Sequence, residues 1–175
     1  MELFARYVVD TNVVIDLSRR IHPVRLRREA NDVMEKLLAA GSIVSHREVF
    51  LELESGAKQG DVALAWAKSH QPIFVDLTPT QEEHLVKVLS EHPDILDPKK
   101  IGHDADPLLV ALALDIGGVV VSGDGSTHRS GKKQIKDVCD AYSVRCIDID
   151  EFLTENGWLV EASGSAAETV GPVAR

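Results

Sequence analysis

The sequence contains few of the features that mark disulfide-rich, redox-active or membrane-spanning proteins. Cys139 and Cys146 are the only cysteines, and no CxxC spacing links them, so we expect two reduced core residues rather than a disulfide framework. Apolar runs such as residues 108–114 are far shorter than the roughly 20 residues of a membrane-spanning helix. The first residues lack the basic region and cleavage site of a signal peptide. We therefore expect a cytoplasmic protein with no membrane contact.

Positive charge is also scarce, because the formal net charge is −9 at pH 7. This balance argues against a protein that holds duplex DNA on a broad basic face. Basic residues are concentrated locally instead, at Arg19, Arg20, Arg25, Arg27 and Arg28 and at Lys132, Lys133 and Lys136. Arg25 and Arg28 are three apart and would share one helix face. A solvated helix surface and an RNA-binding surface both remain open as interpretations of this pair.

The composition is that of an ordinary soluble globular domain, with 44% hydrophobic and 27% charged residues. A chain of 175 residues can bury one sizeable core, whereas two independent domains would each be marginal. We predict a single domain over residues 1–158 that includes a helical insertion at 61–100. Residues 159–175 are rich in Ala, Gly, Ser and Glu and are predicted to form a flexible tail.

Short apolar segments alternate with segments of helical periodicity along the chain. The pattern predicts strands at residues 7–9, 43–44, 119–121 and 145–147. It predicts helices at residues 24–40, 45–56, 62–68, from 78 towards 93, 104–114, 134–142 and 148–156, with the middle of the chain wholly helical. The predicted N-terminal caps are Ser45 with Glu48, Thr78 with Gln81, Asp104, and Asp148 with Glu151.

This alternation of strands and helices predicts an α/β fold, because parallel strands need long crossover connections that are usually helical. Ligands of such sheets bind beyond the carboxyl ends of the strands. Asp10 directly follows the first strand, and Asp124 follows the 119–121 strand after Ser122 and Gly123. We therefore expect Asp10 and Asp124 to lie at the same edge of a mostly parallel sheet.

Two further acids are expected at that edge. Glu52 borders an apolar helix face that includes Val49 and Leu53, and Asp106 lies in the first turn of its helix. A strand-end aspartate such as Asp10 could also be a simple helix cap, but four converging acids are harder to explain as caps. Hard oxygen ligands without a Cys/His set or an HExxH motif favour Mg²⁺ or Mn²⁺ over zinc. Such ions promote phosphodiester hydrolysis.

The order of these acids resembles that of the PIN-domain nucleases. The matching segments are a strand followed by Asp10-Thr11-Asn12, then Val49-x-x-Glu52-Leu53, then Asp106-Pro107-Leu108-Leu109-Val110-Ala111, then Val121-Ser122-Gly123-Asp124. The sequence is most similar to a bacterial PIN-like subgroup with a longer helical middle, and is similar to ribonuclease toxins of toxin–antitoxin modules. The resemblance implies a PIN-like three-layer α/β/α fold around a short, mostly parallel sheet.

The resemblance also implies an activity and a set of partners. It implies an endoribonuclease that needs Mg²⁺ or Mn²⁺, cleaves single-stranded RNA to 5′-phosphate and 3′-hydroxyl ends, forms homodimers and is neutralised by an antitoxin protein. The family's catalytic and metal-binding acids correspond to Asp10, Glu52, Asp106 and Asp124. Asn12 and Ser122 would be supporting polar groups, whereas Asp104 would be either a helix cap or a further supporting acid. Arg25 and Arg28 are the RNA-binding candidates.

Two departures from the family pattern limit which properties of the family can be expected of this chain. Many relatives have a further acid shortly after the fourth motif, where this chain has Gly125-Ser126-Thr127, so a second metal ion would be held weakly. The segment 61–100 exceeds the minimal domain. The RNA target, the cut sequence, the antitoxin, the number of metal ions and the oligomeric state do not follow from the sequence.

Some of these residues also resemble the motifs of other classes of protein. His103-Asp104 is similar to the signature of His-Asp metal phosphohydrolases, but those folds are all helical, whereas four strands are expected here. Response-regulator receiver domains place acids at strand ends, but their paired acids and switch lysine are not evident. The non-enzymatic alternative is a PIN-like fold that no longer catalyses a reaction and binds RNA or a protein partner. The weak match at the fourth motif favours this alternative.

Overall fold

The computed structural model describes residues 5–19, 32–33, 35–98, 102–123 and 133–157. The strands are β1 (Tyr7–Val9), β2 (Ile43–His46), β3 (Phe74–Val75), β4 (Val119–Val121) and β5 (Cys146–Ile147). The helices are α1 (Thr11–Arg19), α3 (Arg47–Gly56), α4 (Val62–Ser69), α5 (Pro79–Glu91), α6 (Asp106–Ile116), α7 (Ile135–Ala141) and α8 (Ile149–Glu155), with 3-10 turns at Gln71–Ile73 and Pro93–Ile95. Residues 32–33 and 35–39 are also helical.

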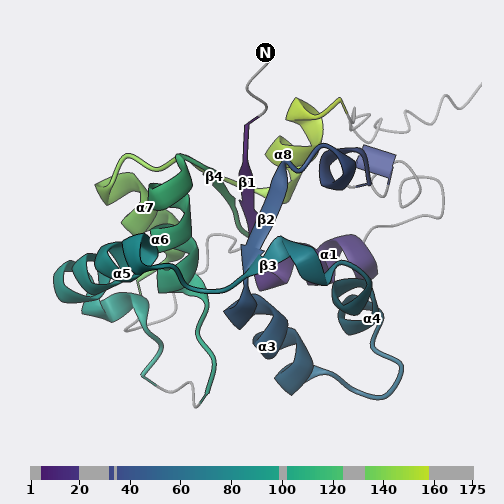
Figure 1. Cartoon of the computed structure of the whole chain (residues 1–175), viewed down its shortest axis with the longest axis horizontal. Coiled ribbons are helices and arrows are strands. Elements are labelled where there is room, and N and C mark those ends of the chain that lie inside the picture. The colour runs from purple at the N-terminus through teal and green to yellow at the C-terminus, as the bar shows by residue number, and fades with distance from the viewer. Residues whose placement is uncertain (1–4, 20–31, 34, 99–101, 124–132, 158–175) are drawn as a thin grey trace, which may run out of the picture.

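The described strands form one five-stranded sheet in the order β3-β2-β1-β4-β5, and every neighbouring pair is parallel. Figure 1 shows α5, α6 and α7 on one side of this sheet and α1, α3 and α4 on the other. The α/β class and the layered, parallel architecture expected from the sequence are therefore confirmed.

The strand sequences explain why the sheet lies in the core. Strands of a parallel sheet are covered on both faces, so they are apolar without alternation. β1 and β4 read Tyr-Val-Val and Val-Val-Val, and Val8, Val9, Val120 and Val121 are fully buried. The hydrophobic helix α6 packs against β1, β2 and β4 and ends at Gly117, whose φ of 63° is left-handed and favours glycine.

Several predicted helix caps are confirmed. The Thr78 hydroxyl accepts from the Gln81 N–H and the Gln81 side chain accepts from the Thr78 N–H, which completes a capping box at α5. The Asp148 carboxylate accepts from the Glu151 N–H at 2.8 Å and begins α8. These caps were predictable because each depends on residues three apart in the chain.

Two predicted caps are wrong. α3 begins after His46, whose ring Nδ1 accepts from the Glu48 N–H at 3.0 Å, while Ser45 donates to the Val9 carbonyl of the neighbouring strand at 2.7 Å. α6 begins after Ala105 without a side-chain cap, because Asp104 accepts from the Asp97 N–H at 3.1 Å. In both cases a contact made by the fold replaces the local one.

The extent of regular structure also differs from prediction at two places. The middle of the chain is not wholly helical, because Phe74 and Val75 form β3 and pair with Ser45 and His46 of β2. A two-residue edge strand leaves too short a pattern to recognise. α1 directly after β1 was not predicted as a helix. The predicted tail at 159–175 and the first part of the predicted 24–40 helix lie outside the described residues.

Both cysteines are free thiols, and Cys139 is buried whereas Cys146 is half-buried. A hydrogen bond with Cys146, together with burial, raises the pKa of the Cys139 thiol. In the part of the chain that the structure describes, no helix has the length and apolar character needed to span a bilayer.

Candidate active site

The strand order creates one switch point in the sheet. From β1 the chain continues to β2 and β3 on one side, and later returns to β4 and β5 on the other side of β1. Ligands of parallel α/β sheets bind at such a point, beyond the carboxyl ends of the strands. Asp10 follows β1, and Ser122 and Gly123 follow β4. The topology therefore brings two of the predicted motifs together.

Asp10 is held in a buried position at this switch point. Its side chain is 3% exposed, and the Ser122 hydroxyl donates to Oδ2 of Asp10 at 3.0 Å. The Asp10 N–H donates to the Val121 carbonyl at 3.0 Å, and the Asp10 carbonyl accepts the N–H groups of Val13 and Val14, which begins α1. Asp10 thus ends β1 and starts α1 with its carboxylate turned towards β4. Ser122, predicted as a supporting polar group near a metal ion, is thus in contact with Asp10, and its role at a metal site stays a prediction.

Ser45 supports the same strand end and was not predicted. It is fully buried, and its hydroxyl donates to the Val9 carbonyl at 2.7 Å. A buried carbonyl at the end of a strand needs a partner, and Ser45 supplies it from β2. The sequence signal was a polar residue, Ser45, inside an apolar strand. This serine was instead interpreted as a helix cap.

Glu52 joins the site through two hydrogen bonds. It lies on α3 beside the buried residues Val49 and Leu53, as its helical position predicted. The Thr11 hydroxyl donates to Oε2 of Glu52 in a short contact, and the Ala105 N–H donates to Oε1 at 3.1 Å. Glu52 therefore connects the residue after Asp10 to the residue before Asp106.

Asp106 and Asn12 complete the described part of the site. Asp106 is the first residue of α6 and is half-buried, next to the Ala105 amide that binds Glu52. Asn12 is exposed on α1, and a Cβ atom added to Gly123 would lie 3.0 Å from the Asn12 Cβ and 3.5 Å from Oδ2 of Asp16. Asp16 therefore also lies near the end of β4, although sequence reasoning did not select it.

Other predicted site residues lie elsewhere or outside the description. Asp104 binds the Asp97 amide, so its described contact supports the loop before α6. Asp124, Arg25 and Arg28 lie outside the described residues. Among the described residues, no group of three or more His, Cys, Asp and Glu side chains is close enough to hold a metal ion. The predicted roles of Asp10, Glu52, Asp106 and Asp124 as metal ligands remain predictions.

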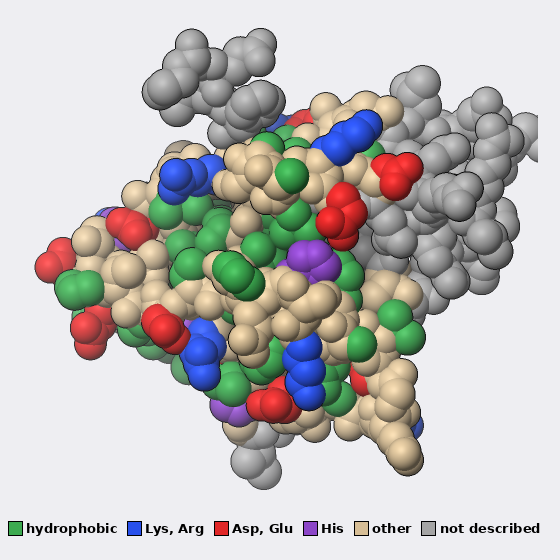
Figure 2. Space-filling view, turned by 45° about the vertical axis from the view of Figure 1, so that its right-hand side comes forward, with side chains coloured by type: hydrophobic (Ala, Val, Ile, Leu, Met, Phe, Trp, Pro, Cys, Tyr) green, Lys and Arg blue, Asp and Glu red, His purple; other side chains and the backbone are tan. Residues whose placement is uncertain are grey.

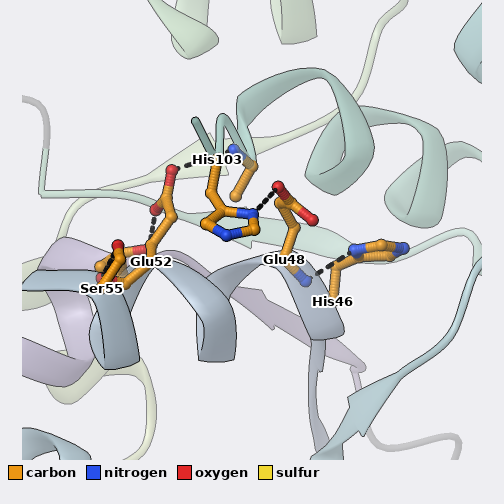
Figure 3. Close-up of polar contacts among 7 residues, drawn as sticks. His46, Glu48, Glu52, Ser55 and His103 are labelled. Carbon is orange, nitrogen blue, oxygen red and sulfur yellow. Dashed lines mark hydrogen bonds and ion pairs between the residues drawn. The ribbon is translucent and has the colours of Figure 1, made fainter. Parts of the chain in front are cut away.

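A second polar cluster lies along the same face of α3. Figure 3 shows the His103 ring next to Glu48, with Glu52 further along the helix and His46 at its start. His103 Nδ1 lies 2.6 Å from Oε1 of Glu48. His46 is 5% exposed, and its pKa is lowered by burial, an effect that Glu48 and Asp76 partly oppose. His46 therefore favours the neutral form that its capping contact requires.

The donor chemistry of the site fits a hard divalent cation. Carboxylates and a hydroxyl are the groups at this edge, and Mg²⁺ and Mn²⁺ prefer such oxygen ligands. Asp10 contributes a buried carboxylate whose Oδ2 accepts from the Ser122 hydroxyl. A cation bound at this edge would add a further contact to that carboxylate.

Two solved structures are similar to this chain. A solved chain of VapBC2 from Rickettsia felis, crystallised with a DNA fragment from its promoter, is 16% identical, with a TM-score of 0.52 over 81% of this chain and 97% of that chain. A chain of FitAcB from Neisseria gonorrhoeae is also 16% identical, with a TM-score of 0.49 over 81% and 96%. No curated protein matches in sequence.

The PIN-like fold predicted from the sequence is confirmed by the parallel five-stranded sheet and by the likeness to the VapBC2 chain. A family model matches residues 7–160, which include every described strand and helix. The chain belongs to this family, which is described as a domain of unknown function (DUF4411).

Proposed function

We propose that this protein is a metal-dependent endoribonuclease that hydrolyses phosphodiester bonds in single-stranded RNA and acts as the toxin of a toxin–antitoxin module. The observation that carries the proposal is the buried Asp10 carboxylate at the switch point between β1 and β4, with Glu52 hydrogen-bonded to the next residue. A PIN-like fold with acids at this edge is suited to holding a divalent cation against a phosphodiester.

Asp10, Glu52 and Asp106, together with Asp124 as predicted from the sequence, would hold Mg²⁺ or Mn²⁺. The bound cation would activate water and neutralise charge on the phosphate. Ser122 orients the Asp10 carboxylate, and Thr11 orients that of Glu52. Both carboxylates are therefore held in place before substrate binds, which reduces the ordering that catalysis requires.

The partners and location in this proposal come from the resemblance to PIN-domain toxins. They are an antitoxin protein, a second copy of the chain in a homodimer, and a cytoplasmic setting. Arg25 and Arg28 would bind phosphates that flank the cleaved bond. Neutralising both residues should weaken RNA binding and flatten its salt dependence while metal affinity is retained.

Cleavage of labelled single-stranded RNA by the purified chain tests the proposal. The wild-type protein should cleave the RNA in the presence of Mn²⁺, and EDTA should prevent cleavage. Asp10→Asn should abolish cleavage. Cleavage that persists in both conditions would come from a contaminant or from another mechanism and would contradict the proposal.

A binding module without turnover is the second candidate. The observation that favours it is that each carboxylate oxygen of Glu52 already accepts a protein hydrogen bond, from Thr11 and from Ala105. This arrangement also suits a structural link between α3 and the loop before α6. Mn²⁺ binding without RNA cleavage would favour the binding module.

A further inference from the structure

Glu48 and Glu52 are four residues apart on α3 and therefore lie on one helix face. The loop before α6 crosses this face, because His103 contacts Glu48 and the Ala105 N–H donates to Glu52 at 3.1 Å. Figure 3 shows the His103 ring between the side chains of Glu48 and Glu52 in projection. His103 therefore contacts the helix face that also carries Glu52, the acid to which Thr11 donates.

Glu48 determines which ring nitrogen of His103 is available. An ionised carboxylate only accepts hydrogen bonds, so Nδ1 of His103, at 2.6 Å from Glu48, carries a hydrogen. The His103 side chain is 38% exposed and that of Glu48 is 22% exposed. In the described part of the chain, the contacts of His103 with polar groups involve Nδ1 alone, which leaves Nε2 for a ligand.

The acidic site needs donors for an incoming phosphate. On the face shown in Figure 2, the described Lys and Arg side chains lie apart rather than in one basic patch. On α3 itself, Arg47 lies 3.6 Å from Asp76, so its described ion pair is with another part of the fold. Among the described residues around Glu52, the imidazole of His103 is therefore a candidate donor to a phosphate oxygen.

We infer that His103, oriented by Glu48, donates a hydrogen bond from Nε2 to a phosphate oxygen of the substrate next to the cleaved bond. This inference rests on the proposed function. In the complex the ring carries hydrogens on both nitrogens: Nδ1–H binds Glu48, Nε2–H binds the phosphate, and the second proton comes from solvent. Carboxylate and phosphate then flank one imidazolium, which is a charge-assisted arrangement. Glu48 is a positioning residue in this scheme.

A purely structural role is the competing explanation, because the contact between His103 and Glu48 also attaches the loop to α3. Binding measurements in an Asp10→Asn background, which prevents cleavage, separate the two. The probe is a 5′-labelled single-stranded oligouridylate RNA with Mn²⁺. His103→Gln should raise the Kd for this RNA about tenfold, and Glu48→Gln should raise it less. His84 is a half-buried histidine on α5 and provides the control. His84→Gln should leave the Kd unchanged.

Ring nitrogen NMR tests the contact directly in the chain without a histidine substitution. On addition of the RNA, the Nε2 resonance of His103 should shift as this nitrogen binds the phosphate, and the resonances of His84 should not. A structural role predicts no change in this resonance and equal RNA affinity for His103→Gln and His84→Gln, and either result would overturn the inference.

The outcomes also distinguish this inference from the proposed function. Cleavage that is abolished by Asp10→Asn but has the same kcat and KM in His103→Gln as in wild type would overturn the inference alone. Absence of cleavage together with weaker RNA binding by His103→Gln would support the contact and contradict the nuclease. A wild-type chain that neither cleaves nor binds the RNA would contradict both.

Discussion

The Asp10 side of the candidate site is buried, whereas the Glu52 side is half-exposed. Asp10 and Ser122 are 3% and 5% exposed, and Ser45, which binds the end of β1, is fully buried. Glu52, Thr11, Glu48 and His103 are all half-buried and contact one another through side chains or single amides. The two sides are therefore held by different kinds of interaction.

This difference predicts where substitutions will be costly. A buried polar group that loses its partner carries a full desolvation penalty, whereas water can replace a lost partner at a half-exposed site. The buried side should therefore control whether the site exists at all. The half-exposed side should control how substrate and metal are bound, with smaller effects on folding.

The largest expected effect is on activity at the buried side. If the proposed function holds, Asp10→Asn should lower kcat/KM roughly 100-fold or more, because one ligand charge is lost where charge develops in the transition state. Its amide oxygen can still accept from Ser122, so the metal-free melting temperature should rise or stay unchanged. Mn²⁺ should stabilise the wild-type chain but not Asp10→Asn. A clear fall in the metal-free melting temperature would identify Asp10 as a structural cap.

A second prediction compares two buried serines near the start and end of β2. Ser45→Ala removes the partner of the Val9 carbonyl and should destabilise the fold by about 1–3 kcal/mol. Ser42 is 2% exposed, and its hydroxyl has no hydrogen-bond partner within the described residues. Ser42→Ala should therefore be neutral or stabilising. Urea unfolding of both variants measures the contrast, and equal losses would contradict it.

The next prediction concerns pH and His46. Burial lowers its pKa from the ordinary value of 6.5, so the unfolded chain binds the proton more readily than the folded chain. This contribution to stability is complete above about pH 6.5 and is lost as the pH falls towards the lowered folded pKa, with a slope of at most ~1.4 kcal/mol per pH unit.

His46→Asn is the matched control, because asparagine caps helices well and does not titrate. Chemical denaturation between pH 5 and 8 should show a steeper acid loss of stability in wild type than in His46→Asn. Parallel curves would mean that His46 takes up its proton equally in the folded and unfolded chains.

The smallest expected effect is at the half-exposed side. Thr11→Val removes the hydroxyl that donates to Glu52 and should lower the free energy of unfolding by no more than about 1 kcal/mol, because water can reach Glu52. If Glu52 is a metal ligand, Mn²⁺ affinity should be equal or higher once Thr11 no longer competes for Oε2. Calorimetric titration measures this affinity, and a large loss would show that Thr11 positions Glu52 for the metal.

Four of the five described strands, the helix caps at Thr78 and Asp148, and the closeness of the segments that follow β1 and β4 could be predicted because they follow from local patterns combined with one rule of topology. Apolar runs at 7–9 and 119–121 identified β1 and β4. Because the carboxyl ends of parallel strands share an edge, the residues after them had to be near one another. Glu52 was predictable from its place on the helical wheel beside Val49 and Leu53.

Two of the contacts that were missed join segments distant in sequence. Ser45 binds Val9, 36 residues away, and His103 binds Glu48, 55 residues away. A serine three residues before a glutamate has the same local pattern whether it caps a helix or binds a neighbouring strand. The local signal therefore favoured the wrong partner, and β3 was too short to give any signal.

The sequence by itself determined the α/β class and four of the five described strands, because each depends on residues a few positions apart. The tertiary structure alone decided that Asp10 is buried against Ser122 while Glu52 stays half-exposed, and that His103 lies on the face of α3. Burial and long-range hydrogen bonds depend on how helices pack on the sheet. That packing is a property of the whole fold rather than of any local pattern.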